Sequence, residues 1–283
     1  MIDQPLSTRE AVLSGSDFKT VAAILHSEAR ISLSEGKISL VQSRLARRLR
    51  QRGIPDFGSY LKLVRDDAEE RAEMVTALTT NHTHFFREKH HFDHLRDTVL
   101  PELKEQSERG SPVRIWSAGC SSGEEPYTIA MVLAGINRGD ARWLDGNVRL
   151  LATDIAQPMV TATRNARYPV LEADQIPLPY RALWLSEEGS ELAINPKLVN
   201  LVTARPLNLF TPWPFQRQFD VIFCRNVMIY FDADARADLE ARLVAQLRPG
   251  GWLYIGHSER LSGIAASQTV CVGQTMYRKR EQS

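Results

Sequence analysis

The chain has 283 residues, 43% of them apolar, which allows an ordinary buried core in one large domain or two small ones. Its 35 basic and 34 acidic residues nearly cancel, so the net charge argues neither for nor against a nucleic-acid partner. Three widely spaced cysteines without a CxxC pair exclude a disulfide framework and are typical of a reducing compartment.

The first part of the chain is predicted to be a small all-α domain, residues 1–80. Its first thirty residues lack a basic segment followed by an apolar one, and no run of eighteen apolar residues occurs anywhere, so we expect a cytoplasmic protein without membrane insertion. Four helices are predicted between Asp17 and Thr80 from capping residues and apolar periodicity: one capped by Ser16 or Asp17, then Lys37–Arg52 after Ser34, Asp56–Val64 and Ala68–Leu78.

The second of these helices is strongly basic. Arg44, Arg48 and Arg52 recur once per turn beside its apolar stripe, and Arg47 and Arg50 lie elsewhere on its surface. A solvated face is the usual meaning of such a run. The density of arginines nevertheless favours docking of an acidic partner along Arg44, Arg48 and Arg52.

Residues 81–111 are predicted to be a linker or junction that ends in a charged connector, Glu102 to Ser111. Residues 112–283 then alternate strands and helices, which indicates an α/β domain with a mostly parallel sheet. The predicted strands are Val113–Ser117, Val148–Thr153, Leu198–Ala204, Val221–Cys224, Trp252–Gly256 and Thr269–Arg278. The predicted helices between them are Tyr127–Ile136, Pro158–Arg164 and Ala233–Leu247.

The stretch 168–200 fits neither element, because it is rich in proline, glutamate and leucine. We interpret it as an insertion of turns and short antiparallel strands.

A glycine loop joins the first strand of this domain to its first helix. Gly119 and Gly123 bracket it, and such a turn lets backbone N–H groups approach a ligand closely. The spacing is not GxGxxG and no GK[ST] follows, so a dinucleotide or phosphate site is not indicated. Glu124 and Glu125 instead suit a ligand with positive charge, such as the sulfonium and amino groups of S-adenosylmethionine (SAM). The loop therefore predicts a methyltransferase with a Rossmann-like fold.

Polar groups follow four predicted strands, where open parallel sheets bind their ligands. They are the loop Ser117–Glu125, Asp154, Asn208-Leu209 and Arg225-Asn226. Asp154 can accept both ribose hydroxyls of SAM, although a helix cap for Pro158–Arg164 would place an acid there too.

Four segments together resemble the chemotaxis receptor glutamate O-methyltransferase family, CheR. They are residues 78–87 (LTTNHTHFFR), 117–127 (SAGCSSGEEPY), 223–231 (FCRNVMIYF) and 256–259 (GHSE), and the match runs from about Phe18 to Tyr277. The first and third are highly specific, whereas the glycine loop alone indicates only a SAM site.

The resemblance implies roles for particular residues. Asn81, Thr83 and Arg87 would contact the cofactor from the junction of the two domains, and Tyr230 and Arg87 would lie nearest the transferred methyl group. The rest of the pocket would be lined by Glu125, Asp154, Asn208, Leu209, Arg225 and Asn226. The product would be S-adenosylhomocysteine.

The resemblance also implies a substrate, the cytoplasmic domain of chemotaxis receptors, whose glutamates would become methyl esters during sensory adaptation. Family members that dock a receptor's C-terminal pentapeptide have a longer, glycine-richer loop where this chain has Leu185–Leu192, so that docking is not expected here. We expect a monomer without a nucleic-acid partner.

Two alternatives remain open: a SAM-dependent methyltransferase of RNA or a small molecule, and a non-catalytic SAM-sensing adaptor. The basic helix permits RNA, but no aromatic residues are interleaved among its arginines for base stacking. The histidines between His82 and His94 could suggest a metal, yet no acidic triad or cysteine pair completes a ligand set, so no metal site is predicted.

Overall fold

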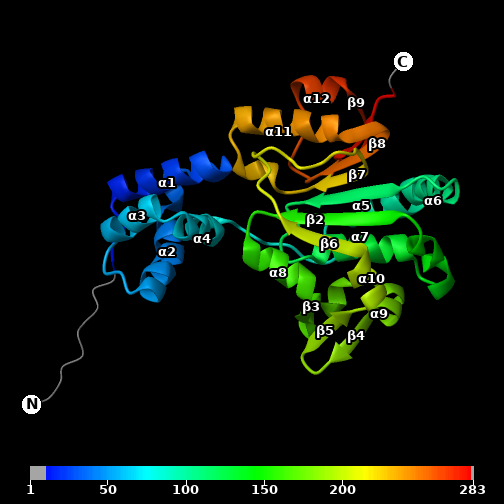
Figure 1. The fold of residues 1–283 in the computed structure, drawn as a ribbon, viewed down its shortest axis with the longest axis horizontal. Coiled ribbons are helices and arrows are strands. Elements are labelled where there is room, and N and C mark those ends of the chain that lie inside the picture. Colours follow the sequence, from blue (N-terminus) through cyan, green and yellow to red (C-terminus); the bar gives the residue numbers. More distant parts are fainter. Residues whose placement is uncertain (1–10, 282–283) are drawn as a thin grey trace, which may run out of the picture. The chain divides into compact units, whose positions relative to one another are not determined.

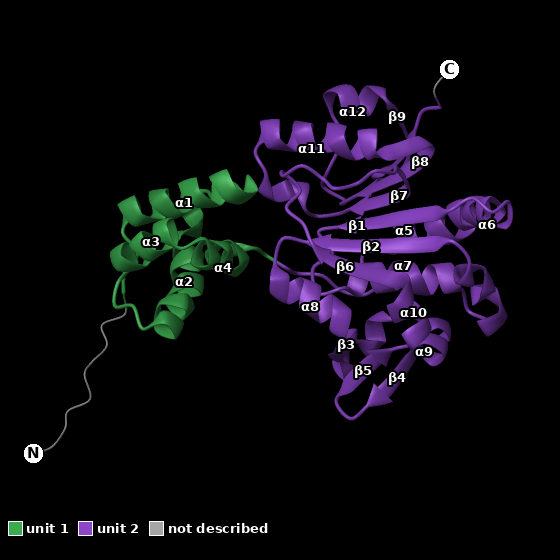
Figure 2. Cartoon of the chain, viewed as in Figure 1, with its two compact units in different colours: residues 1–80 green, residues 81–283 purple. Residues whose placement is uncertain are grey.

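The computed structural model describes residues 11–281. The chain divides after Thr80 into two compact units, which Figure 2 shows in different colours. Within the described residues, every helix is too short or too polar to cross a membrane.

The first unit is all-helical, as the sequence predicts. It contains α1 (Gly15–Ala29), α2 (Ile38–Arg52), α3 (Phe57–Asp66) and α4 (Ala68–Leu78), with the 3-10 turn η1 (Glu35–Lys37) before α2. The cap of α1 is neither Ser16 nor Asp17. Ser14 caps it, because its side chain accepts a hydrogen bond from the Asp17 backbone while the Asp17 carboxylate reaches back to the Ser14 backbone.

Three arginines of α2 hold this unit together. Arg48 donates from Nε and Nη2 to the two oxygens of the buried Glu70, at 3.0 and 2.8 Å, and Arg52 Nε lies 3.2 Å from the same carboxylate. Arg44 donates to the backbone oxygens of Leu78 and Thr79, both at 2.8 Å, and so satisfies the carboxyl end of α4. The predicted docking strip is therefore also a set of internal contacts.

The second unit begins with the irregular residues 81–88 and then becomes helical where a linker was predicted. The helical part runs through α5 (Lys89–His94), the π-helical turn η2 (Leu95–Val99) and α6 (Leu100–Glu108). Leu95, Val99 and Leu103 are buried and recur at four-residue steps, which is the apolar stripe of a packed helix. The predicted charged connector from Glu102 is therefore mostly part of α6.

A seven-stranded sheet forms the centre of this unit, in the order β6-β2-β1-β7-β8-β10-β9 (Figure 1). Its strands are β1 (Val113–Ala118), β2 (Val148–Asp154), β6 (Val202–Pro206), β7 (Phe219–Cys224), β8 (Leu247–Ile255), β9 (Thr269–Gly273) and β10 (Met276–Lys279). The first five pair in parallel and only β10 runs antiparallel to its neighbours, so the sheet is mostly parallel, as predicted. The carboxyl ends of β1, β2, β6 and β7 thus share one edge.

Helices connect and cover these strands. They are α7 (Glu124–Ala134), α8 (Gln157–Asn165), α10 (Pro196–Leu201), α11 (Ala233–Gln246) and α12 (Gly263–Ser267), with the 3-10 segments η3 (Arg138–Asp145) and η5 (Met228–Tyr230). Helices α7, α8 and α10 pack against β2 and β6, and α11 packs against β8. The resulting core buries β1, β7 and nearly all of α7, which fixes the loop between β1 and α7 on a rigid base.

Three strand predictions are wrong in part. The predicted strand Leu198–Ala204 is α10 followed by β6, because Asn195 caps a helix that opens with Pro196. The predicted strand Thr269–Arg278 is the hairpin β9–β10, turned at Thr275 with φ +57°. Strand β8 begins at Leu247, so it includes the Pro-Gly-Gly stretch that was expected to precede it.

The insertion forms a separate small sheet, as predicted. Strands β3 (Arg167–Pro169), β4 (Leu185–Glu188) and β5 (Glu191–Ile194) pair antiparallel in the order β3-β5-β4, beside η4 (Val170–Gln175) and α9 (Leu178–Trp184). Figure 1 shows this sheet near α9 and α10, on the β6 side of the large sheet.

Candidate functional site

The glycine loop after β1 is held tightly to the neighbouring strands. The N–H groups of Gly119 and Cys120 both donate to Thr153 O at the end of β2, at 2.8 and 2.9 Å. Gly119 has φ +77°, and a Cβ added there would lie 2.5 Å from a methyl carbon of Val227. Gly123 has φ +106°, and a Cβ would lie 2.6 Å from the Tyr168 hydroxyl. Both positions require glycine, because any side chain would meet backbone strain and a clash.

The first turn of α7 brings Glu125 into the site. Its Oε1 accepts from the Ser117 hydroxyl at 2.7 Å, and its Oε2 lies 3.1 Å from Arg225 Nη1. Burial raises the pKa of Glu125, although Arg225 and Ser117 act in the opposite direction. A carboxylate at the carboxyl ends of β1 and β7 is thus held in place by partners on both strands.

Asp154, at the end of β2, is buried, and each of its oxygens already accepts a backbone hydrogen bond. Oδ2 accepts from Ser121 N at 2.8 Å and Oδ1 from Ala156 N at 2.9 Å. Burial raises its pKa, and these hydrogen bonds oppose the shift. The carboxylate therefore supports the glycine loop and the turn that leads into α8. It is not the cap of α8, whose cap residue is Ala156 without a side-chain cap hydrogen bond, and its role as a ribose acceptor stays a prediction. Each oxygen has a second lone pair left for a ligand hydroxyl.

Asn208 and Leu209 follow β6. Asn208 Oδ1 accepts from Phe210 N at 2.9 Å, and Leu209 O accepts from Arg242 of α11 at 2.7 Å. Leu207 N donates to Asp154 O at 2.9 Å, so the segment after β6 is tied to the end of β2.

The segment 81–87 also reaches this edge of the sheet. Asn81 O accepts from the Ser121 hydroxyl at 2.9 Å, which ties the segment to the glycine loop. The Arg87 side chain donates to His82 O at 2.9 Å, and Arg87 O accepts from Arg225 Nη2. Thr83 is partly exposed and makes no hydrogen bond or ion pair with the other candidates among the described residues.

Asn226 follows β7 in a left-handed conformation, with φ +58°. Its backbone N–H donates to Glu259 Oε2 at 3.2 Å, and the same carboxylate accepts from Gly256 N at 2.5 Å and, through Oε1, from Ile229 N at 3.2 Å. A Cβ on Gly256 would lie 2.5 Å from Asn226 Nδ2. Glu259 therefore fixes the turn that carries the residues after β7.

Sequence reasoning missed two carboxylates of this site, Glu259 and Glu88. Oε1 of Glu88 accepts from Asn226 Nδ2 at 3.2 Å and from His257 Nδ1 at 3.0 Å, and its Oε2 lies 3.3 Å from Arg225 Nη2. Burial alone would raise the pKa of Glu88, but Arg225, His257 and Asn226 outweigh it and lower the pKa to about 2. In the sequence, the only indication of Glu88 was its position beside Arg87. The only indication of Glu259 was its position in the segment GHSE.

Glu88 also lies beside the histidines of α5. Glu88, His90 and His91 each place a possible ligand atom within 4.8 Å of one another. The Arg225 guanidinium already balances the charge of Glu88, which makes a cation less favourable there. That the chain holds no metal stays a prediction.

Tyr230 ends η5, and its side chain is partly exposed. Its hydroxyl makes no hydrogen bond with any described residue. The contacts thus join Arg87, Glu125 and Asn226 into one network through Arg225 and Glu88, and join Asn81 and Asp154 into another through Ser121. Among the described residues, Thr83, Leu209 and Tyr230 make no hydrogen bond with these candidates.

The two networks fit SAM chemically. Buried carboxylates can accept ribose hydroxyls and face the cationic groups of the cofactor. The Nε of buried Arg225 has no hydrogen-bond partner among the described residues, so this guanidinium retains an unused donor.

Comparisons with known families agree with this fit. The family model described as "CheR methyltransferase, SAM binding domain" matches residues 81–277, and the one described as "CheR methyltransferase, all-alpha domain" matches residues 16–79.

Curated proteins resemble the chain over most of its length. A "Probable chemotaxis protein methyltransferase" of Rhizobium etli is 42% identical over 261 residues, which cover 90% of this chain and 96% of that protein. A "Chemotaxis protein methyltransferase" of Escherichia coli is 36% identical and covers 95% of this chain and 93% of its own length. Among solved structures, the CcbJ methyltransferase of Streptomyces caelestis is 15% identical with a TM-score of 0.33, covering 55% of this chain and 51% of that one.

Proposed function

Because the chain belongs to the CheR family of SAM-dependent chemotaxis methyltransferases, we propose that it transfers a methyl group from SAM to glutamate side chains of chemotaxis receptors and forms glutamyl methyl esters. The observation that carries the proposal is the buried network in which Arg225 contacts Glu125, Glu88 and the backbone of Arg87.

In this proposal the cofactor is held by the candidate residues at the strand ends. Asp154 accepts the ribose hydroxyls, and Glu125 and Arg225 face the charged end of the cofactor. Asn81, Thr83, Asn208, Leu209 and Asn226 complete the pocket. This assignment is supported by the shared edge of β1, β2, β6 and β7 and by the resemblance of the segments that carry these residues.

The chemistry needs alignment more than proton transfer. Bound SAM supplies an activated methyl group, and a glutamate with a pKa near ~4.3 is already an ionised nucleophile at neutral pH. The chain's own residues must therefore orient that carboxylate and exclude water from it. We assign the orientation to Arg87, a guanidinium that can bind a carboxylate, and to the Tyr230 hydroxyl, which has no hydrogen-bond partner among residues 11–281.

The receptor is proposed to dock on the basic helix α2. Arg44, Arg48 and Arg52 contribute to the field of this helix, although their guanidinium groups also make internal contacts. Arg47 and Arg50 are exposed and make no hydrogen bond or ion pair through their side chains with any described residue. We therefore add these two as the residues that meet an acidic receptor surface most directly.

A transfer assay with three acceptors separates the proposal from its alternatives. The full chain is incubated with methyl-tritiated SAM and, in turn, with a receptor cytoplasmic fragment, total RNA and a small-molecule extract. The proposal predicts label in the receptor fragment. The label should be lost in Tyr230→Phe, which should still bind S-adenosylhomocysteine, and in Arg87→Ala, in which cofactor binding should weaken as well. Label only in RNA or small molecules would favour the second methyltransferase class, and cofactor binding without transfer to any acceptor would favour an adaptor.

A further inference from the structure

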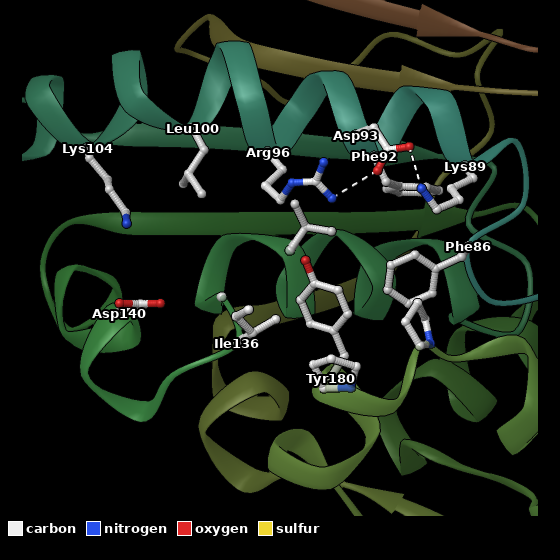
Figure 3. Close-up of a pocket in the computed structure, with 14 residues that line it drawn as sticks. Phe86, Lys89, Phe92, Asp93, Arg96, Leu100, Lys104, Ile136, Asp140 and Tyr180 are labelled. Atoms are coloured by element: carbon white, nitrogen blue, oxygen red, sulfur yellow. Dashed lines mark hydrogen bonds and ion pairs between the residues drawn. The ribbon is translucent and has the colours of Figure 1, made fainter.

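A groove separate from the strand ends lies between the helical segment α5–η2–α6 and the chain around α7 and α9. Its volume is about 480 Å³, within the range of about 300–1,000 Å³ that is usual for small-molecule sites. Figure 3 shows Lys89, Asp93, Arg96, Leu100 and Lys104 along one wall. They follow one another at three- and four-residue steps, as residues on one helix face do. The groove therefore runs along one face of this helical segment.

Opposite the helix the groove is mostly apolar, apart from Asp140. Figure 3 shows Phe86, Tyr180 and Ile136 across from the helix. Ile136 is 50% exposed, and Leu178, beside the lining prolines Pro177 and Pro179, is 75% exposed. Large apolar side chains exposed around a concave surface commonly mark a binding site. This side of the groove thus favours a ligand with an apolar body.

The charged side chains along the groove differ in the partners that they contact. Asp93 is occupied by Lys89 at 2.6 Å and by Arg96 at 2.9 Å. Asp140 accepts from Asn137 Nδ2 at 3.1 Å, and this neutral donor leaves the charge of Asp140 in place. Lys104 makes no hydrogen bond or ion pair with any described residue through its side chain. The lining therefore holds three cations, Lys89, Arg96 and Lys104, against two carboxylates, Asp93 and Asp140, and its net charge is positive. Figure 3 shows Lys104 at one end of the groove, beyond Leu100.

We propose that this groove binds an amphipathic small molecule, with its apolar body over Ile136, Tyr180 and Phe86 and its anionic head at Lys104. A π-helical turn lies in the middle of the helical wall, at Leu95–Val99, and such turns often occur at functional sites.

Two aromatic residues connect the groove to the cofactor network. Phe86 and Phe92 line its inner end with their ring centres 5.7 Å apart. Phe86 directly precedes Arg87 and has φ +55°, and the guanidinium carbon of Arg225 lies 5.3 Å from the centre of the Phe92 ring. A ligand that moves either ring would shift a candidate SAM residue. Occupancy of the groove is therefore expected to change cofactor affinity, an effect that rests on the assignment of Arg87 and Arg225 to the SAM site.

The first test measures binding itself. The fluorescence of 1-anilinonaphthalene-8-sulfonate, an apolar dye with one anionic group, is followed on protein saturated with S-adenosylhomocysteine, and sodium decanoate is added as competitor. We expect one dye per chain, displaced by decanoate and far less by neutral decanol. Ile136→Glu should weaken dye binding at least about tenfold, and Lys104→Gln about three- to tenfold, whereas Lys104→Arg should retain it.

Leu171→Glu is the matched control, because Leu171 is 86% exposed and lies outside the groove. It should bind the dye like the wild type, and both glutamate variants should keep the wild-type melting temperature. Wild-type dye affinity in Ile136→Glu, equal displacement by decanol, or loss of dye binding when the cofactor site is saturated would each overturn the proposed site.

The second test measures coupling. The Kd of S-adenosylhomocysteine is determined by calorimetry with and without saturating decanoate. We expect a change of about fivefold or more in the wild type and none in Ile136→Glu. Equal Kd values in the wild type, with decanoate bound, would overturn the connection to the cofactor network.

Discussion

Arg225 and Glu125 are 100 residues apart in the sequence, and Arg225 Nη1 lies 3.1 Å from Glu125 Oε2 at the carboxyl ends of β7 and β1. Both side chains are nearly buried, so each charge depends on the other and on the polar groups around it. The guanidinium also touches Glu88, which makes Glu88 the group that decides how Arg225 is oriented.

Glu88→Gln should weaken cofactor binding and reduce activity. Glutamine keeps the shape of the side chain but removes the charge that faces Arg225, so Arg225 and Asn226 lose part of their orientation. Because both residues are assigned to the cofactor pocket, we expect the Kd of S-adenosylhomocysteine to rise about tenfold and kcat to fall about ten- to hundredfold. Kinetics with a receptor fragment and calorimetry measure the two effects.

Glu108→Gln, an exposed position at the end of α6, is the control for Glu88→Gln and should behave like the wild type. If Glu88→Gln lowers the melting temperature but leaves kcat unchanged in the folded protein, Glu88 is a structural residue only.

Asp154→Ala should weaken binding of S-adenosylhomocysteine by about 1–3 kcal/mol, the usual cost of removing a charged acceptor from ligand hydroxyls. The melting temperature should fall as well, since Ser121 N and Ala156 N lose their acceptor. Asp174→Ala, at a fully exposed carboxylate, should change neither quantity. Unchanged affinity in a folded Asp154→Ala protein would remove this residue from the site.

The paired reversal Arg47→Glu and Arg50→Glu should raise the apparent KM for the receptor and leave both SAM affinity and melting temperature intact. These side chains have no partner in the described part of the chain, so their charge can attract an acidic surface. Rising salt should weaken the wild type in the same direction. Steady-state kinetics against receptor concentration provide the measurement.

Reversal of Arg44, Arg48 and Arg52 should raise the KM too, but it should also lower the melting temperature, because Glu70 would lose its cations. Arg65→Glu, an exposed position on α3, is the control. A wild-type KM in the folded Arg47 and Arg50 variant would rule out α2 as the docking face and favour the insertion 168–200.

His91 should make the protein sensitive to acid. Burial and the nearby Arg225 lower its pKa to about 3, well below that of an unfolded histidine. A lowered pKa means that the unfolded state binds the proton first, so the contribution of His91 to stability is complete above about pH 6.5 and falls as the pH decreases towards 3. Denaturant unfolding of the wild type between pH 7.5 and 4.5 should show this loss.

His91→Gln should flatten the pH dependence by up to about 1.4 kcal/mol per pH unit, the value for one proton. The exposed His82→Gln should retain the wild-type slope. Equal slopes in wild type and His91→Gln would show that His91 is not the titrating group. The lowered pKa of Glu88 adds a further loss only at lower pH, below about 4.3.

The sequence predicted what short-range patterns determine. The fourth helix, Ala68–Leu78, has the bounds predicted from capping and periodicity, and the polar residues after four strands do meet at one edge of the sheet. The strand error at Leu198–Leu201 arose because a short apolar run fits a helix and a strand equally well, and only Asn195 and Pro196 before it indicate a helix.

Long-range contacts were beyond such patterns. Nothing in the segment around Glu88 indicates that its carboxylate meets Arg225 and His257, more than a hundred residues later. In the same way, regular spacing on α2 indicated a basic strip, but not that Glu70 of α4 already binds Arg48 and Arg52. The pairing of charges depends on the fold, whereas their spacing can be seen in the sequence.

The most direct test of the proposed reaction is the stability of the transferred methyl group in alkali. The full chain first labels a receptor cytoplasmic fragment with tritiated SAM. The labelled fragment is then treated with base, and the volatile radioactivity is collected. Methyl transfer to a glutamate carboxylate predicts that the label is released as methanol, and that peptide mass spectrometry places each methyl group on glutamate. A label that survives base, as a methyl group on nitrogen or on nucleic acid would, contradicts the account.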